Sequence, residues 1–265
     1  MHFLFPSDPI DLRQPDEPFR EQADEVRKLG IGVSVVALDE LGQKNCRLRG
    51  PIPRDATVVY RGWMLTPAEY EGLLDLIRSG GAVPLISLEK YLLCHYLPNW
   101  YPLISEFTAE TRVFPANANL ANELRALGWQ KFFIKDFVKS LKTSVGSVIA
   151  DPADITLVVS EMQKFRGAIE GGVCVRQFEE FIPNSERRYF VIAKRPHAPS
   201  GSPPELVFEC AQRVQSPFFS IDVAVNSDGV DRVVEIGDGQ VSDLVGWDAA
   251  AFAQLWSDAP LGGIS

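Results

Sequence analysis

The sequence predicts an α/β lobe followed by an α+β lobe that is rich in antiparallel strands. Over roughly the first hundred residues, apolar strands alternate with helical segments, which is the pattern of an open and mostly parallel sheet. From residue 171 onward, the pattern changes to consecutive strands separated by turn residues. The chain has 265 residues, of which 46% are hydrophobic, so it is long enough for two lobes that each bury a sizeable core.

The first lobe begins with a short apolar strand and continues as alternating helices and strands. Its strongest local signal is Thr66-Pro67, where a helix N-cap is followed by proline at the first helical position. Gly30 and Gly80 mark the ends of two helices. The expected strands are residues 2–5, 31–38, 56–63 and 82–86, and the expected helices are residues 19–29, 67–79 and 87–96.

The second lobe begins near Thr108 and becomes strand-rich toward its end. Its last two strands form a hairpin around the turn signal Asn226-Ser227-Asp228-Gly229. The expected helices are residues 117–127, 154–165 and 247–256. The expected strands are residues 130–135, 173–178, 187–193, 205–213, 219–225 and 230–236, with a polar loop at residues 139–146.

Composition and charge argue against several classes of protein. The net charge is −9, from 35 acidic and 26 basic residues, whereas a protein that binds a nucleic-acid backbone carries a basic surface, so no nucleic-acid partner is expected. The four cysteines form no CxxC pair, which argues against a zinc site or a disulfide scaffold. We recognise no signal peptide, and no apolar run approaches the roughly 20 residues of a membrane span. We therefore expect a cytoplasmic protein that does not interact with membranes.

Two carboxylates come close together on the final hairpin. With a four-residue turn, Asp222 faces Val233 and Glu235 faces Ser220, so Asp222 and Glu235 are diagonal neighbours about 7–8 Å apart. Carboxylates at this distance repel each other unless a cation lies between them. Mg²⁺ bound through carboxylates and nucleotide phosphates fits this pattern. The alternative is a half-exposed hairpin whose polar face carries acids without a function.

Lys135 ends an apolar strand and is followed by a polar loop that contains Lys139. A lysine that emerges from a buried strand into a cleft is a suitable point charge for phosphate. A loop rich in hydroxyl residues and lysines can close over a phosphate with its backbone N–H groups. The loop lacks the GxxxxGK[ST] pattern, which argues against a P-loop nucleotidase. The alternative is a solvated basic loop.

An extended segment follows the strand at residues 173–178 and has the composition of a nucleotide-binding hinge. Such a segment can offer backbone N–H and C=O groups to an adenine edge, with Phe181 and Ile182 as apolar walls. Glu179 and Glu180 open the segment, and a pair of acids at a strand end can also be simply solvent-facing. Glu186, beyond the turn, is placed to accept hydrogen bonds from ribose hydroxyls.

Three arginines are candidates for binding anions. Arg176 and Arg188 lie on strands of the second lobe, where they would neutralise phosphate oxygens or a substrate carboxylate. Arg61 ends a strand of the first lobe, at the position where ligands of open α/β sheets usually bind. It is therefore the candidate for an acidic substrate or its acyl phosphate. The alternatives are surface ion pairs for the first two, and a structural arginine stacked on Trp63 for the third.

As an ordered set, these segments resemble the ATP-grasp superfamily, and more narrowly its small clade named for two arginines and a lysine. The resemblance covers about residues 108–256, with Arg61 in the preceding lobe. The segments that carry it are YRGWM at 60–64, FFIKDFVKS at 132–140, RQFEEF at 176–181, ERRYF at 186–190 and VEIGDGQVSD at 234–243.

The resemblance implies a pre-ATP-grasp α/β lobe at residues 1–107 and an α+β ATP-grasp domain with antiparallel sheets at residues 108–265. Within that domain, residues 108–170 form the subdomain with the lysine and the loop, and residues 171–265 form the subdomain with the hinge and the metal hairpin. The implied reaction joins a small-molecule or peptide carboxylate to an amine through an acyl phosphate, uses ATP and Mg²⁺, and releases ADP and phosphate. The alternatives are an ATP-dependent kinase of a small molecule and a nucleotide-binding module without turnover.

The resemblance also implies roles for single residues. Most ATP-grasp enzymes carry Asn two residues after the metal-binding Glu, whereas this chain has Gly237, so either Asp238 or Gln240 takes that place. The implied catalytic residues are Arg61, Lys139 and Arg188. The implied nucleotide-binding residues are Lys135, Arg176, Glu179, Glu180, Phe181, Ile182 and Glu186, and the implied metal ligands are Asp222, Glu235 and Asp238.

Overall fold

The fold is known from a computed structural model, which describes residues 1–43, 46–138, 146–166 and 169–257. The chain forms two compact units. The first unit comprises Met1–Cys94, Arg187–Ile221 and Gly237–Ser265, and the second comprises His95–Glu186 and Asp222–Ile236. The two units are thus interleaved along the sequence. The predicted domain boundaries, after residues 107 and 170, follow the order of the sequence instead and stay a prediction.

A five-stranded sheet forms the centre of the first unit, with the strand order β3-β2-β1-β4-β5. β1 pairs in parallel with β2 and with β4, β4 pairs in parallel with β5, and β3 runs antiparallel to β2. This mostly parallel sheet is the one expected from the alternating pattern, except that β3 was not expected. The strands are β1 (His2–Pro6), β2 (Gly32–Val36), β3 (Leu48–Arg49), β4 (Thr57–Tyr60) and β5 (Val83–Pro84).

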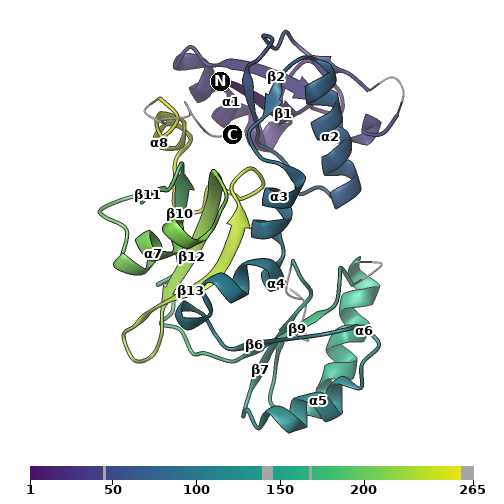
Figure 1. Cartoon of the computed structure of the whole chain (residues 1–265), viewed down its shortest axis with the longest axis vertical. Helices are drawn as coiled ribbons and strands as arrows, with labels where there is room; N and C mark the ends of the chain where they lie inside the picture. The colour runs from purple at the N-terminus through teal and green to yellow at the C-terminus, as the bar shows by residue number, and fades with distance from the viewer. Residues whose placement is uncertain (44–45, 139–145, 167–168, 258–265) are drawn as a thin grey trace. The chain divides into compact units, whose positions relative to one another are not determined.

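The chain leaves β1 and β4 toward opposite edges of this sheet. The helix α1 (Arg20–Lys28) connects β1 to β2, whereas α2 (Pro67–Ser79) connects β4 to β5 (Figure 1). The crevice outside the carboxyl ends of two such strands is the topological switch point of an open α/β sheet. The α2 helix begins with the predicted cap, since Thr66 Oγ1 accepts a hydrogen bond from the Glu69 N–H, and the Glu69 carboxylate accepts one from the Thr66 N–H.

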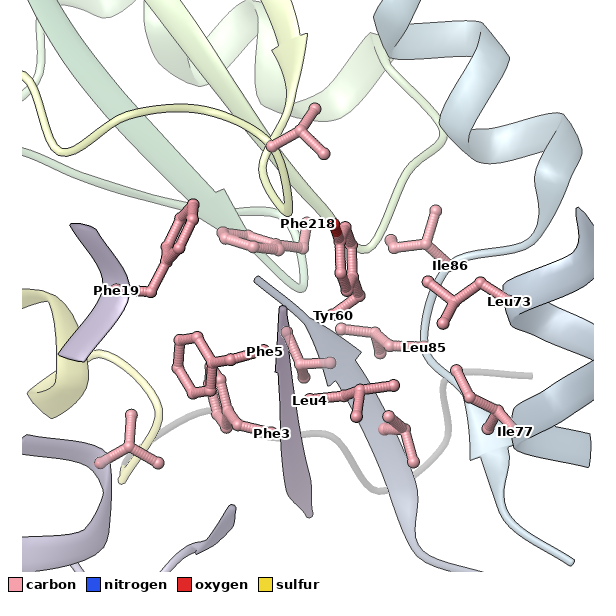
Figure 2. Close-up of a cluster of buried hydrophobic side chains, with 14 of the residues drawn as sticks. Phe3, Leu4, Phe5, Phe19, Tyr60, Leu73, Ile77, Leu85, Ile86 and Phe218 are labelled. Carbon is pink, nitrogen blue, oxygen red and sulfur yellow. The ribbon is translucent and has the colours of Figure 1, made fainter. Parts of the chain in front are cut away.

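Aromatic residues dominate the core of the first unit. Phe3 and Phe5 of β1 project to one side of the strand and Leu4 to the other (Figure 2). The ring of Trp256 lies edge-on to Phe3 at 5.2 Å and to Phe218 at 4.7 Å. Trp256, which follows α8, therefore packs against the first strand and belongs to the same core.

One element of the first unit differs in type from the prediction. Residues 205–213, expected as a strand, form the helix α7 (Glu205–Arg213). Its buried residues Val207, Cys210 and Ala211 recur at helical spacing, so burying this one face favours a helix. The predicted closing helix is shorter than expected and begins after the N-cap Asp248. The other elements here are α3 (Leu88–His95), β10 (Arg187–Ile192), β11 (Arg195–His197) and α8 (Ala249–Gln254).

The second unit contains a four-stranded antiparallel sheet with the order β6-β9-β7-β8. The helices α5 (Leu120–Leu127) and α6 (Ile155–Arg166) pack together and share a core with β7 and β9 (Figure 1). The strands are β6 (Thr111–Phe114), β7 (Phe132–Lys135), β8 (Val148–Ile149) and β9 (Val173–Gln177), and a short helix, α4, spans Leu97–Trp100. The 3₁₀ turns of the two units are Glu17–Phe19, Leu38–Glu40, Tyr101–Leu103, Ser105–Phe107 and Pro152–Asp154. No helix within the described ranges is both long enough and apolar enough to cross a membrane.

The predicted hairpin forms, but with a different register. It consists of β12 (Phe218–Val225) and β13 (Asp231–Asp238), in a sheet of order β11-β10-β12-β13. Asn226 N–H donates to the Val230 carbonyl, so residues 227–229 form the loop, which is one residue shorter than predicted. Farther along the two strands, the Ser220 hydroxyl lies 3.5 Å from the carbonyl of Gly237, so Ser220 lies beside Gly237 and not opposite Glu235, two residues from the predicted pairing. A shift of two residues keeps every side chain on its predicted face, so Asp222 and Glu235 still share one.

Candidate nucleotide and metal site

Lys135 and Glu235 form an ion pair within the second unit. Lys135 ends β7 and is 5% exposed, whereas Glu235 lies on β13 and keeps 39% of its side chain exposed. Nζ of Lys135 donates to Oε1 of Glu235 over 2.6 Å. The residue predicted to bind phosphate and a residue predicted to bind metal therefore contact each other through a charge-assisted hydrogen bond.

Asp222 is the second carboxylate on this face of the hairpin. It lies on β12 and is 5% exposed. Across the described part of the chain, no group of three His, Cys, Asp or Glu side chains is positioned to hold a metal ion. Mg²⁺ requires fewer protein ligands than that, because it keeps several waters and binds through one or two carboxylates plus substrate phosphates. Asp222 and Glu235 therefore fit a Mg²⁺ site that a nucleotide would complete.

Arg176, on β9, adds a buried positive charge close to Glu235. Its Nη1 donates to the Val234 carbonyl at 2.7 Å and its Nη2 donates to Oγ1 of Thr108 at 2.5 Å, whereas its Nε has no partner. Burial lowers the pKa of Arg176, and the nearby charges of Glu235 and Glu179 oppose that shift. A buried cation that keeps one unused donor is suited to an anion.

Glu179 is bound by Arg232, a residue that the sequence pattern did not single out. Nε and Nη2 of Arg232 donate to the Glu179 carboxylate at 3.1 and 2.8 Å. The same guanidinium donates to the carbonyls of Glu106 and Thr108 at 2.8 and 2.6 Å. The Glu179 carboxylate is thus used inside the protein, which fits a role in fixing the hinge. The feature of the sequence that could have identified Arg232 is its position as an arginine among the valines of the predicted strand at residues 230–236.

The predicted hinge is an extended segment that pairs with the end of β12. Ile182 N–H donates to the Val225 carbonyl and Ser227 N–H donates to the Glu180 carbonyl, at 2.8 and 2.9 Å. Because the backbone groups of successive extended residues point to opposite sides, the N–H and C=O of Phe181 point away from β12. Within the described ranges these two groups have no backbone partner. Phe181 therefore carries the pair of groups that could meet an adenine edge.

Arg61 is built into the core of the first unit. It is 1% exposed, and its guanidinium stacks over the ring of Phe252 at 4.8 Å. Its hydrogen-bond acceptors are Oε1 of Gln22 and the carbonyls of Gly239 and Ser242. Burial lowers the pKa of Arg61 to about 10. The geometry corresponds to the alternative of a structural arginine, with Phe252 as its stacking partner in place of Trp63, and gives no support to a contact with substrate.

Asp238 and Gln240, the two candidates for a third metal ligand, bind each other inside the first unit. Oδ1 of Asp238 accepts from N and Nε2 of Gln240 at 3.0 and 3.1 Å, whereas Oδ2 has no partner. Burial raises the pKa of Asp238 to about 7, although the bonds from Gln240 oppose the shift. Gln240 also accepts from the Tyr60 N–H and donates to the Tyr70 hydroxyl. Both side chains are engaged in the core, so the geometry supports an internal role for each.

Gly237 is explained by packing. A Cβ atom at this position would lie 2.9 Å from the hydroxyl oxygens of both Ser220 and Ser242, which is closer than real Cβ contacts allow without a shift. These two hydroxyls are 2.7 Å apart and bind each other. The two serines therefore fill the space that an asparagine side chain would need.

Three further predicted residues contribute less to the described geometry. Glu186 is exposed in the second unit. Arg188, on β10 of the first unit, donates through Nη1 to the carbonyl of Asp243 at 3.0 Å. Lys139 lies outside the described residues. Their predicted roles stay predictions.

The chain matches a known protein family over about its second half. Residues 126–257 match an ATP-grasp domain, namely family 3 of the clade named for two arginines and a lysine. This stretch contains Lys135, the strand arginines Arg176 and Arg188, and both hairpin acids. No curated protein matches the chain by sequence.

Solved structures share the fold over nearly the whole chain. D-cycloserine synthetase DcsG has a TM-score of 0.65 at 12% identity, with 97% of this chain and 99% of that chain covered. The RimK domain protein ATP-grasp from Sphaerobacter thermophilus has a TM-score of 0.64 at 16% identity, with 96% and 98% covered. Macrocyclase MdnC, bound with precursor peptide MdnA from Microcystis aeruginosa, has a TM-score of 0.64 at 11% identity, with 98% and 100% covered. These likenesses confirm the predicted fold class, an α/β lobe followed by an α+β fold with antiparallel sheets.

Proposed function

We propose that this chain, which belongs to the ATP-grasp clade named for two arginines and a lysine, is an ATP- and Mg²⁺-dependent ligase that joins a carboxylate to an amine. Support comes from the family and from the similar folds of a synthetase and a macrocyclase. A carboxylate oxygen of one substrate attacks the γ-phosphorus of ATP, and the bond to ADP breaks. The nitrogen of the second substrate then attacks the acyl carbon, inorganic phosphate leaves, and the nitrogen loses a proton.

The observation that carries this proposal is the contact between Lys135 and Glu235. A cation from β7 and an acid 100 residues later on β13 meet at one point, and Asp222 shares the face of the hairpin. Phosphoryl transfer requires mainly positioning and charge neutralisation, so a protein nucleophile is not needed. Lys135 would bind phosphate oxygens, with Arg176 adding positive charge. Asp222 and Glu235 would hold Mg²⁺, which neutralises charge on the phosphates.

The remaining predicted residues would hold the nucleoside and the substrates. The backbone of Phe181 would meet the adenine, with Glu180 and Ile182 beside it and Glu186 at the ribose. Arg188 would face the substrate carboxylate or its acyl phosphate. A peptide is one possible class of substrate for this chain, because MdnC, which has a similar fold, is bound with a precursor peptide.

One assay separates this function from its alternatives. Purified protein is incubated with Mg·ATP and pools of amino acids and short peptides, and ADP and new covalent products are followed by mass spectrometry. ADP together with a new amide supports the ligase. ADP together with a phosphorylated acceptor would favour a kinase, and ATP binding without turnover would favour a binding module. The Asp222→Asn variant should lose ADP formation in the same assay.

A further inference from the structure

A hollow of about 310 Å³ lies in the first unit at the topological switch point of its sheet. Phe19 and Glu21 line it from the segment that follows β1, and Trp63 lines it from the segment that follows β4. These two segments leave the sheet toward opposite edges, which is the position where open α/β sheets bind ligands. We call this hollow the switch-point crevice.

Two indole rings form rigid walls of the crevice. Nε1 of Trp63 donates to Asp16 at 2.8 Å, and the Trp63 ring lies edge-on to Phe19 at 5.1 Å. Trp63 nevertheless remains 46% exposed. Nε1 of Trp247 donates to the Arg188 carbonyl at 3.0 Å. Rings that are fixed before a ligand arrives lose little freedom on binding, and their faces attract cations.

Among the described residues, the charged side chains that line the crevice are all acidic. They are Glu21, Asp243 and Asp248, of which Asp248 caps α8 by accepting from the Ala251 N–H. Within the described part of the chain, the carboxylates of Glu21 and Asp243 have no hydrogen-bond partner. A hollow with this lining suits a positively charged ligand and is unfavourable for an anion.

Two cations lie near the crevice, but the protein uses both. Arg61 is 1% exposed and donates to Gln22 and to two main-chain carbonyls. Arg188 donates to the main-chain carbonyl of Asp243 and not to its carboxylate. The charge of Asp243 acts on the buried Arg61 and raises the pKa of that group, but the Asp243 side chain is exposed, so its carboxylate can also contact a ligand at the surface of the crevice.

Gln22 adds a polar donor at the same place. It is 7% exposed and lines the crevice, and its Oε1 accepts from both Nε and Nη2 of Arg61, at 3.2 and 2.8 Å. These two hydrogen bonds from Arg61 fix the orientation of the amide. Nε2 of Gln22 has no hydrogen-bond partner within the described ranges. It also keeps some surface that solvent can reach. Nε2 can therefore donate to a neutral oxygen of a ligand.

We propose that the switch-point crevice binds the amine substrate, as a primary ammonium group next to a neutral oxygen on an apolar stem. The ammonium lies against Asp243 and Glu21, the oxygen accepts from Gln22, and the stem lies between Trp63 and Trp247. The statement that this ligand is a substrate rests on the proposed ligase function. The prediction that the crevice binds it does not depend on that function. The first lobe was expected to bind the acidic substrate through Arg61. We instead assign the amine substrate to this lobe.

Binding is tested by calorimetry with two matched probes and no nucleotide. L-phenylalaninamide carries an ammonium group, an amide oxygen and an aromatic stem, and 3-phenylpropanamide lacks only the amine. At about pH 6 the α-amino group is protonated and the carboxylates are ionised. We expect L-phenylalaninamide to bind at least about tenfold more tightly, as a partly exposed charge pair together with a cation–π contact implies. Equal affinity for the two probes, or no binding of either at millimolar concentration, would overturn the proposal.

Variants locate the probe in the crevice. Asp243→Asn should weaken the binding of L-phenylalaninamide about fivefold, and Trp63→Ala should weaken the binding of both probes. Asp75→Asn is the matched control, since that aspartate is 71% exposed on α2 and its loss should change nothing. Unchanged affinity in Asp243→Asn would contradict the proposal.

The outcomes of this test and of the ligase assay are separable. Selective binding of the ammonium probe in a protein that forms no ADP would support the crevice and contradict the ligase. Amide formation that is unaffected by Asp243→Asn and by Trp63→Ala would support the ligase and overturn the crevice as the amine site.

Discussion

Nζ of Lys135 lies 2.6 Å from Oε1 of Glu235, although the two residues are 100 positions apart in the sequence. In the proposed site, the lysine binds phosphate and the glutamate binds Mg²⁺. The structure thus pairs the cation expected to bind phosphate with the acid expected to bind the metal. Phosphate that binds Lys135 would free Glu235 to bind Mg²⁺. Likewise, Mg²⁺ that binds Glu235 would free Lys135 to bind phosphate.

The first prediction concerns this exchange. Lys135→Met should weaken the binding of a non-hydrolysable ATP analogue at least about tenfold, because a buried charge-assisted contact to phosphate is lost. Glu235→Gln should remove most of the effect of Mg²⁺ on that affinity. Both are measured by calorimetry with and without Mg²⁺. Lys164→Met is the control, since Lys164 pairs with Glu161 on the exposed side of α6. Nucleotide affinity that is unchanged in Lys135→Met would remove this lysine from the site.

The second prediction concerns the hinge. Arg232→Met leaves the Glu179 carboxylate and two carbonyls without their donors, so it should lower the free energy of unfolding by about 1–2 kcal/mol and raise the KM for ATP. Chemical denaturation and steady-state kinetics measure the two effects. Arg112→Met, on β6, breaks an exposed ion pair with Glu110 and should leave both quantities nearly unchanged. If the two variants behave alike, Arg232 does not position the hinge.

The third prediction concerns the pH dependence of stability. Burial raises the pKa of Asp238 from 3.8 to about 7 in the folded protein. The unfolded chain therefore releases this proton first, so the free energy of unfolding falls as the pH rises from about 4 to about 7, by about 4 kcal/mol at most. Asp238→Asn should flatten this dependence and raise the melting temperature at pH 8 more than at pH 5. Loss of Mg²⁺-dependent turnover without any change in the melting profile would instead favour Asp238 as a metal ligand.

The fourth prediction concerns Gly237. Gly237→Ala forces a Cβ against the hydroxyls of Ser220 and Ser242 and should cost about 1–3 kcal/mol of stability. Adding Ser220→Ala should recover part of this loss, because it removes one of the two close oxygens. Thermal unfolding of the single and double variants gives the answer. Equal stability of Gly237→Ala and the unaltered protein would show that the serines do not determine this position.

The hairpin acids and Lys135 could be predicted from the sequence because strand alternation and strand ends are local patterns. The contact between Lys135 and Glu235 could not be predicted, because no local pattern specifies which residue of β13 lies against the end of β7. Arg232 was missed for the same reason, because its partner Glu179 is 53 residues away.

One secondary-structure prediction was wrong because burial was decisive. Residues 205–213 alternate well enough for a strand, yet Val207, Cys210 and Ala211 form the buried face of a helix. The predicted roles of Arg61 and Asp238 in ligand binding stay predictions, and the two residues are 1% and 0% exposed. Charge and position in a motif can be read from a sequence, whereas enclosure by distant segments cannot.

Transfer of a labelled oxygen tests the proposed reaction most directly. Carboxylic acids labelled with a heavy oxygen isotope are supplied with Mg·ATP and an amine pool, and the inorganic phosphate is analysed by mass spectrometry. Attack of the carboxylate on the γ-phosphorus moves one carboxylate oxygen into the phosphate that the amine later displaces. We predict labelled phosphate in the same amount as amide, and none with Asp222→Asn or Glu235→Gln. ADP formation that yields only unlabelled phosphate would contradict the ligase proposal.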